Sequence, residues 1–177
     1  MPFEYEVANI DVVPTPVVFR PIEEDVSIMK SIFLHEEYRL QIENFQPRLI
    51  LDCGGNIGCA AVYFANKYPA AQIYSIEPER DNFTLLRYNT AFYDNIHPIK
   101  SALWDKETFI RVEDRGFDKW GFMTFETTAA DPAAIKTATV GRLLADSGFD
   151  EIDLLKVDIE GAEKEIFSAP DVEKSTC

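Results

Sequence analysis

The sequence is poor in the residues that usually build metal centres and disulfide frameworks. Its 177 residues include three cysteines and two histidines, and Cys53, Cys59 and Cys177 show no C-x-x-C spacing. An odd number of cysteines without such spacing argues against both a disulfide framework and a zinc site. We therefore predict no metal site, and we expect Cys53 and Cys59 to be small buried hydrophobic residues.

Positive charge is also scarce. The chain has 17 lysine and arginine residues against 31 aspartate and glutamate residues, which gives a formal net charge of -14 at pH 7. The resulting negative potential repels a phosphate backbone and an anionic lipid surface. We therefore expect neither a nucleic acid nor a membrane as a partner.

Long apolar runs are missing as well. No uncharged apolar segment approaches the roughly 20 residues that a membrane-spanning helix requires, and the opening MPFEYE contains acids instead of a basic leader. These features predict a cytoplasmic protein. The 46% hydrophobic content is nevertheless sufficient for a core, and a chain of this length predicts one domain.

What the sequence does contain is an alternation of short apolar strands and amphipathic helices. We expect strands at residues 48–52, 71–77 and 96–103, with helices over 57–68 and 79–93 between them. A further run, IDLLKV at 152–157, has apolar residues on both faces, as a strand inside a sheet does. This alternation predicts an α/β fold with a Rossmann-like, doubly wound, mostly parallel sheet.

Two stretches depart from this alternation. The proline-rich VVPTPVVF suits an edge strand or surface strap, and the chain after Pro21 places Val26, Met29, Ile32 and Phe33 on one helical face. Between 108 and 127, TFIRVE and GFMTFETT indicate an antiparallel insertion. We therefore expect a strap and front helix packed on the core over 1–47, the core over 48–168, and a tail over 169–177.

The stretch ILDCGGNIG, residues 50–58, lies where the first core strand turns into its helix, with Asn56 as the expected helix cap. Ligands of open parallel sheets bind at such turns. Gly54 and Gly55 allow a tight turn and close approach of a ligand, and Gly58 allows close packing. A dinucleotide fingerprint would need glycine in place of Cys53. The acids Asp52 and Glu77 instead favour a ligand with a ribose diol and a positive charge.

Three motifs in order, LILDCGGNIG, IYSIEPERDNF and IDLLKVDIEGAE, make the chain resemble class I S-adenosylmethionine-dependent methyltransferases, and more narrowly the FkbM family. The resemblance covers residues 20–168. It implies S-adenosylmethionine as the cofactor. It also implies that Glu77 binds the ribose hydroxyls and that Ser101 and Ala102 flank the adenine. The implied contacts to the methionine part are Asp52, Gly54, Gly55, Asn56 and Gly58.

Asp158 and Glu160 follow the fourth core strand, which lies beside the first in this topology. Both are therefore expected to face the transferred methyl group. One would take the proton of an acceptor hydroxyl, or hold a cation that acidifies it. The alternative is that they only complement the start of the next helix. The resemblance implies O-methylation of a hydroxyl on a small molecule or glycan.

The complete sheet of that family has further strands after the fourth, so this chain resembles a version truncated after strand 4. IDLLKV would then be an exposed sheet edge. We expect it to be covered by VVPTPVVF, by the 108–127 hairpin, or by a second copy in a homodimer. The shortfall leaves a catalytically inactive binding or interaction module as an alternative to the enzyme. An NAD-dependent oxidoreductase is a third alternative, weakened by Cys53.

Overall fold

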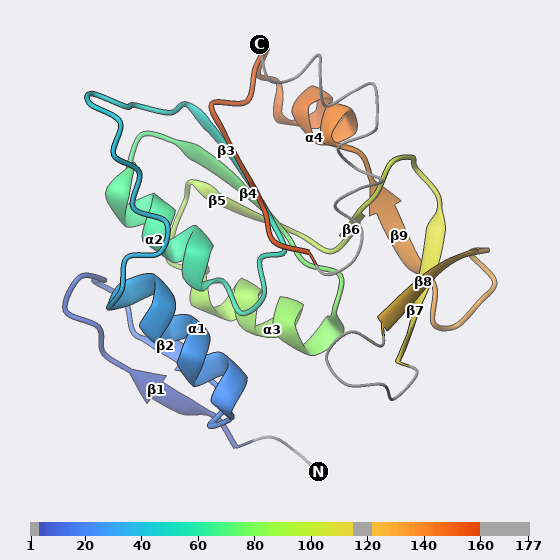
Figure 1. The fold of residues 1–177 in the computed structure, drawn as a ribbon, viewed down its shortest axis with the longest axis horizontal. Helices are drawn as coiled ribbons and strands as arrows, with labels where there is room; N and C mark the ends of the chain where they lie inside the picture. The colour runs from blue at the N-terminus through green and yellow to red at the C-terminus, as the bar shows by residue number, and fades with distance from the viewer. Residues whose placement is uncertain (1–3, 115–121, 160–177) are drawn as a thin grey trace.

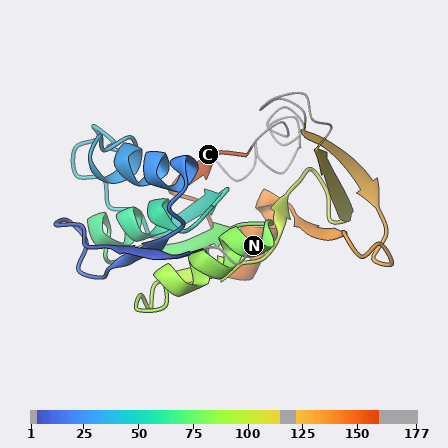
Figure 2. The same cartoon turned by 90° about the horizontal axis from the view of Figure 1, so that it is seen from below.

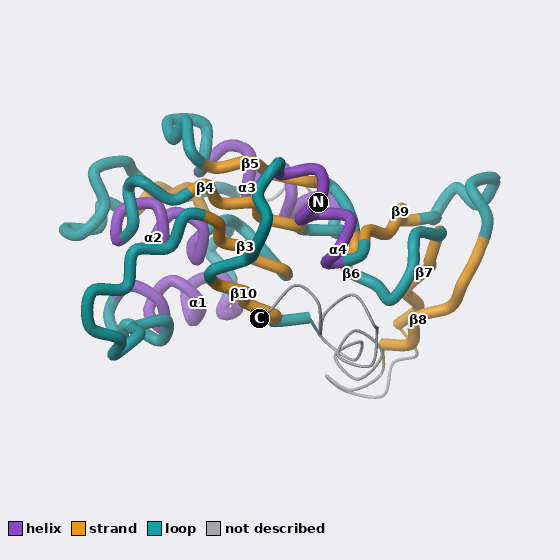
Figure 3. Tube along the Cα trace, turned by 90° about the horizontal axis from the view of Figure 1, so that it is seen from above, coloured by secondary structure: helices purple, strands orange, loops and turns teal. Residues whose placement is uncertain are grey.

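A parallel sheet forms the centre of the computed structural model, which describes residues 4–114 and 122–159 (Figure 1). Its strands lie side by side in the order β10-β3-β4-β5 (Figure 3). Their bounds are β3 (Leu49–Cys53), β4 (Gln72–Ile76), β5 (Ile96–Ile99) and β10 (Leu154–Val157). The expected parallel core is therefore confirmed. The third expected strand, 96–103, is instead divided into β5 and β6 (Ala102–Leu103), which belong to different sheets.

Helices cover both faces of this sheet. Ile50 and Ile73 pack in one apolar cluster with side chains of α1 (Glu23–Phe33), α2 (Cys59–Lys67) and α3 (Arg80–Asn89). Leu49 and Leu51, which point the other way because side chains alternate along a strand, pack with α4 (Val140–Ser147). The doubly wound α/β architecture is confirmed by this division of the core.

A second sheet projects beyond the helices (Figure 2). Its strand order is β6-β9-β7-β8, with β7 at Phe109–Asp114, β8 at Phe122–Thr127 and β9 at Ile135–Ala138. β7 and β8 are antiparallel and place Phe109 opposite Thr127. The antiparallel insertion is thus confirmed. Its connecting turn lies outside the described residues.

The N-terminal segment packs on the face of the core that α2 and α3 cover. Strands β1 (Glu6–Ala8) and β2 (Val17–Phe19) pair with each other, and α1 buries Met29, Ile32 and Phe33 against the core, as its spacing predicts. In the described part of the chain, β10 pairs with β3 alone. Neither the N-terminal strands nor the 108–127 hairpin pairs with β10, so its pairing with a second copy stays a prediction. No helix within the described ranges is long and apolar enough to span a membrane.

Candidate functional site

The glycine loop between β3 and α2 is pinned between the neighbouring strands. The N–H groups of Gly54 and Gly55 both donate to the carbonyl of Ile76, at 3.0 and 2.9 Å. Gly54 has φ +84°, and a Cβ there would lie 1.9 Å from the carbonyl oxygen of Asp158. A Cβ on Gly55 would lie 2.3 Å from Ser75 Oγ. Both glycines therefore let the loop pack against the ends of β10 and β4.

Asn56 is a turn residue and not the helix cap. Helix α2 begins at Cys59 with Gly58 at its N-cap, and no side chain caps it, so the predicted cap was wrong. Asn56 has φ 47°, and its Oδ1 accepts from the N–H of Ile57 at 2.6 Å. Asparagine tolerates this left-handed conformation because its short side chain bonds the local backbone. The backbone N–H of Asn56 is thereby directed at Glu77.

Glu77 follows β4 and holds the loop through its carboxylate. Its Oε2 accepts from the N–H of Asn56 and its Oε1 from the N–H of Glu79, both at 2.8 Å. The residue is only 5% exposed. Burial raises the pKa of Glu77, and the two backbone hydrogen bonds oppose that rise. Each oxygen has a second lone pair, so this carboxylate can also accept from ligand hydroxyls.

A buried ion pair lies under the loop. Lys156 Nζ, in β10, is 3.0 Å from Asp52 Oδ1 and donates to the carbonyl of Gly54 at 2.6 Å. Asp52 is fully buried, and its Oδ2 accepts from Ser75 Oγ at 2.7 Å. Burial lowers the pKa of Lys156, but the Asp52 and Asp158 carboxylates outweigh it and raise the pKa overall. Lys156 therefore remains an ammonium.

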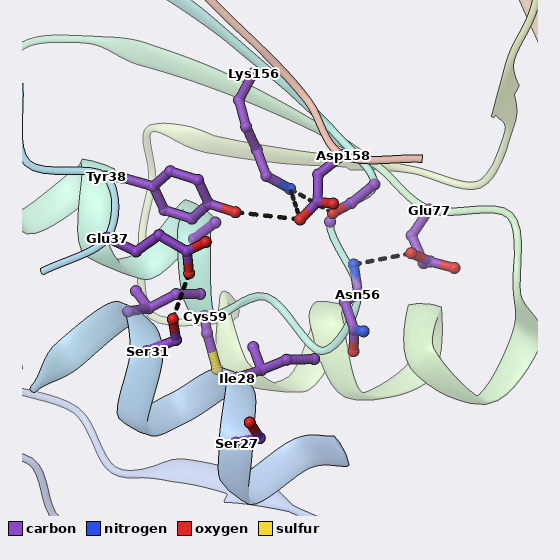
Figure 4. A pocket seen from close by; sticks show the side chains of 14 residues that line it. Ser27, Ile28, Ser31, Glu37, Tyr38, Asn56, Cys59, Glu77, Lys156 and Asp158 are labelled. Carbon is purple, nitrogen blue, oxygen red and sulfur yellow. Dashed lines mark hydrogen bonds and ion pairs between the residues drawn. The ribbon is translucent and has the colours of Figure 1, made fainter. Parts of the chain in front are cut away.

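Asp158 stands at the mouth of the site, directly after β10. Its Oδ2 accepts from Tyr38 Oη at 3.2 Å and lies 3.8 Å from Lys156 Nζ. Burial raises the pKa of Tyr38, and the charge of Asp158 raises it further, so Tyr38 stays protonated and donates. Figure 4 shows Tyr38, Lys156 and Asp158 pointing toward one another.

These groups surround a cavity of about 460 Å³, a size typical of small-molecule sites. Its walls come from α1 and the segment after it, from the glycine loop and from the ends of β4 and β10. The charged lining residues are Glu37, Glu77, Asp158 and Lys156. Because the buried Asp52 balances Lys156, three carboxylates remain and favour a cationic ligand. Among the described residues, no group of three or more His, Cys, Asp or Glu could hold a metal ion.

The structure brings half of the ten predicted site residues together around the cavity. Those that line the cavity are Gly54, Gly55, Asn56, Glu77 and Asp158. Asp52 and Gly58 are not among the lining residues. Ser101 and Ala102 lie elsewhere, where Ser101 lines a separate cavity of about 190 Å³ and Ala102 belongs to β6. Glu160 lies outside the described residues.

Sequence reasoning missed part of the cavity wall. The sequence contains a signal for Lys156, since this lysine interrupts the apolar run LLKV and a buried lysine needs partners. Tyr38 and Glu37 had none, because Tyr38 meets Asp158 from 120 residues away. Helix α1 adds Ser27, Ile28, Ser31 and Ile32 to the lining, and Ser31 donates to Glu37. The site is therefore built partly by the N-terminal segment.

Comparison with known proteins gives a family match and two curated relatives. Residues 52–176 match the model of the Methyltransferase FkbM domain. Methyltransferase sdnD of Sordaria araneosa is 27% identical over an alignment of 179 positions, gaps included, which covers 82% of this chain and 69% of sdnD. The 2-O-methyltransferase NoeI of Sinorhizobium fredii (strain NBRC 101917 / NGR234) is 23% identical over an alignment of 158 positions, gaps included, which covers 78% of this chain and 63% of NoeI. The chain thus spans about two thirds of the length of these relatives.

Two solved structures are similar over part of the fold. The SAM-dependent methyltransferase from Agrobacterium tumefaciens has a TM-score of 0.40 and 15% identity, covering 55% of this chain and 32% of that chain. A methyltransferase from Geobacter sulfurreducens has a TM-score of 0.30 and 19% identity, covering 48% of this chain and 52% of that chain. The family assignment therefore rests on the sequence match.

Proposed function

This chain belongs to the FkbM methyltransferase family, and from that premise we propose that it binds S-adenosylmethionine in the cavity of about 460 Å³. The observation that carries the proposal is the meeting of the glycine loop, Glu77 and an acidic wall at the carboxyl ends of adjacent strands. A sulfonium cofactor is positively charged, and the carboxylates of Glu37, Glu77 and Asp158 favour it electrostatically. When bound, the cofactor would supply an electrophilic methyl group.

The residues have distinct proposed roles toward this cofactor. The Glu77 carboxylate would accept hydrogen bonds from the ribose hydroxyls, since each of its oxygens has lone-pair capacity left. The loop at Gly54, Gly55 and Asn56 would hold the methionine part, with Asp52 and Gly58 supporting it from beneath. Ser101 and Ala102 do not line this cavity, and they remain proposed contacts for an adenine that extends beyond it.

We further propose that the acceptor is a hydroxyl of a small molecule or glycan and that Asp158 takes its proton. The described contacts of the Asp158 side chain engage Oδ2, through Tyr38 and Lys156, so Oδ1 is the oxygen available to an acceptor. Methyl transfer is helped mostly by positioning together with such a base. The similarity to NoeI, a 2-O-methyltransferase, supports an oxygen acceptor. Glu160 stays the alternative base.

Calorimetric titration with S-adenosylhomocysteine tests the cofactor proposal without a known acceptor. We expect the wild-type chain to bind, and Glu77→Gln to weaken binding at least about tenfold, or about 1.4 kcal/mol. Glu36→Gln is the matched control, because Glu36 is an exposed acid that pairs with Arg39 outside the cavity lining. A well-folded wild-type chain that fails to bind would overturn the proposal.

A second candidate function is a catalytically inactive module that keeps the cofactor cavity. The observation favouring it is that the cavity and its carboxylates are sufficient to bind a cationic ligand without any transfer step. Incubation with cofactor carrying a labelled methyl group and a panel of hydroxyl acceptors separates the two. Binding without transfer to any acceptor favours the module, and transfer to one favours the enzyme. The oxidoreductase alternative is set aside, because the family is one of methyltransferases.

A further inference from the structure

One peptide group in the glycine loop is held at both ends. The peptide that joins Gly54 to Gly55 offers its carbonyl to Lys156 Nζ at 2.6 Å and its N–H to the carbonyl of Ile76 at 2.9 Å. Lys156 lies in β10 and Ile76 ends β4, so this peptide group bridges the two strands that flank β3. A peptide between two glycines is otherwise the freest in the chain, because neither residue has a Cβ.

The orientation of this peptide determines that of the next one. The following peptide carries the N–H of Asn56, which donates to Glu77 Oε2 at 2.8 Å. If the Gly54 carbonyl turned away from Lys156, Gly55 would lose its bond to Ile76 and Asn56 would move from Glu77. The cavity wall and the carboxylate facing the ligand therefore depend on one ammonium group.

The ammonium itself is held from below. Asp52 is fully buried, with Oδ1 3.0 Å from Lys156 Nζ and Oδ2 bonded to Ser75 Oγ at 2.7 Å. A lysine side chain without such a partner would populate many rotamers, at an entropic cost for every contact it makes. The negative charge of Asp52 fixes the lysine under the loop. Asp52 does this without lining the cavity.

We propose that Lys156 is a positioning residue that locks the Gly54–Gly55 peptide for ligand binding, and that Asp52 acts through Lys156 instead of touching the ligand. The identity of the ligand rests on the proposed function. The locking of the loop is a property of the free protein and can be measured without any ligand.

The test compares Lys156→Met, Asp52→Asn and the double variant Asp52→Asn/Lys156→Met with the wild type. Lys156→Met leaves the Asp52 carboxylate buried without its ammonium, so it is expected to lower Tm. The double variant removes both charges and keeps an acceptor for Ser75, so its Tm is expected to return toward the wild-type value. Lys67→Met is the control, because Lys67 is an exposed lysine that bonds only Tyr63 in the described contacts.

The readouts are amide hydrogen exchange in the free proteins and calorimetric affinity for S-adenosylhomocysteine. In the double variant we expect the amides of Gly55 and Asn56 to exchange at least tenfold faster, while that of Val62 inside α2 is unchanged. We also expect affinity to fall at least tenfold despite the recovered Tm. The exchange rate of Val62 is the internal reference, because global unfolding would accelerate exchange at Val62 and loosening of the loop would not. The same comparison applies to Lys156→Met, even if that variant is poorly stable.

Two results would overturn this assignment. One is a folded double variant whose Gly55 and Asn56 amides exchange at the wild-type rate. The other is wild-type affinity restored together with Tm, which would mean that Lys156 only supports the fold. A wild-type protein that fails to bind S-adenosylhomocysteine contradicts the proposed function alone, because the exchange comparison still decides the role of Lys156.

Discussion

The central parallel sheet with its helices and the projecting sheet of β6 to β9 use ion pairs in opposite settings. In the central region, the side chains of Arg20 and Asp25 are 10% and 1% exposed. At the projecting sheet, the side chains of Lys106, in the loop between β6 and β7, and Glu126, in β8, are 54% and 52% exposed. Water screens the second pair and is excluded from the first. Removing one partner of each pair is therefore expected to destabilise the protein to very different extents.

The largest expected effect comes from breaking the buried pair. Asp25 accepts from the backbone N–H, Nε and Nη2 of Arg20, which also donates to Asn82 on α3. Asp25→Ala leaves the Arg20 guanidinium without this partner and should lower the free energy of unfolding by about 3–5 kcal/mol. Urea denaturation measures this. The apolar exchange Arg20→Met/Asp25→Leu is the control and should cost far less, whereas an equally large loss would show that charge burial is not the cause.

The next effect is expected at Gly54, where the central sheet meets the site. Gly54→Ala pays for a left-handed backbone, about 1–2 kcal/mol, and for overpacking against the Asp158 carbonyl, about 1–3 kcal/mol. Gly148 ends α4 with φ +77° and nothing within 4 Å of an added Cβ. Gly148→Ala should therefore lose only the about 1–2 kcal/mol of the left-handed backbone, as measured by thermal unfolding. Equal losses in the two variants would mean that the close approach at Gly54 relaxes freely.

A smaller effect is expected from pH, through Glu77. Its folded-state pKa is raised by burial above the ordinary value of 4.5. Between pH 4.5 and the higher folded-state pKa, the native state binds more protons than the unfolded chain. The free energy of unfolding therefore falls as pH rises through this range. Glu77→Gln cannot titrate and lacks this contribution. The stability of the wild type relative to Glu77→Gln should thus decrease as pH rises above 4.5, and denaturation curves with parallel pH profiles would contradict this.

The smallest effect is expected for the exposed pair at the projecting sheet. Lys106→Ala should change the free energy of unfolding by only about 0–1 kcal/mol, and the change should shrink further in high salt. Denaturation at low and high ionic strength measures both. A loss as large as that at Asp25 would mean that this pair is shielded from water, and the contrast between the two regions would not hold.

The local pattern determined most of the central sheet but could not predict where the chain changes sheets. β3, β4 and β10 coincide with apolar runs bounded by polar residues. The run 96–103 looked continuous, yet it divides after Ile99. Ser101 Oγ donates to the carbonyl of Lys136, 35 residues further along the chain. A strand partner so distant leaves no trace in a short window of sequence.

The same distinction applies to the site. Glu77 and the glycines were recognisable because they stand in one contiguous motif or at the end of the next strand. Tyr38 was not, because its role arises from an aromatic contact with Phe64, 5.6 Å between ring centroids, that aims its hydroxyl at Asp158. The prediction of Asn56 as the helix cap was wrong, because residue preference alone does not reveal that its backbone is left-handed. Long-range packing therefore decided the place of Tyr38 in the site.

The side-chain amide of Asn89, at the end of α3, forms hydrogen bonds with backbone groups of two other segments. Its Oδ1 accepts from the N–H of Val18, and its Nδ2 donates to the carbonyls of Val18 and Ile57. A shortened protein that begins at residue 48, where the strand motif begins, would lack Val18. The buried Asn89 side chain would then lose two of its three hydrogen bonds. Shortened recombinant forms should therefore start ahead of β1, or they will be prone to proteolysis and aggregation.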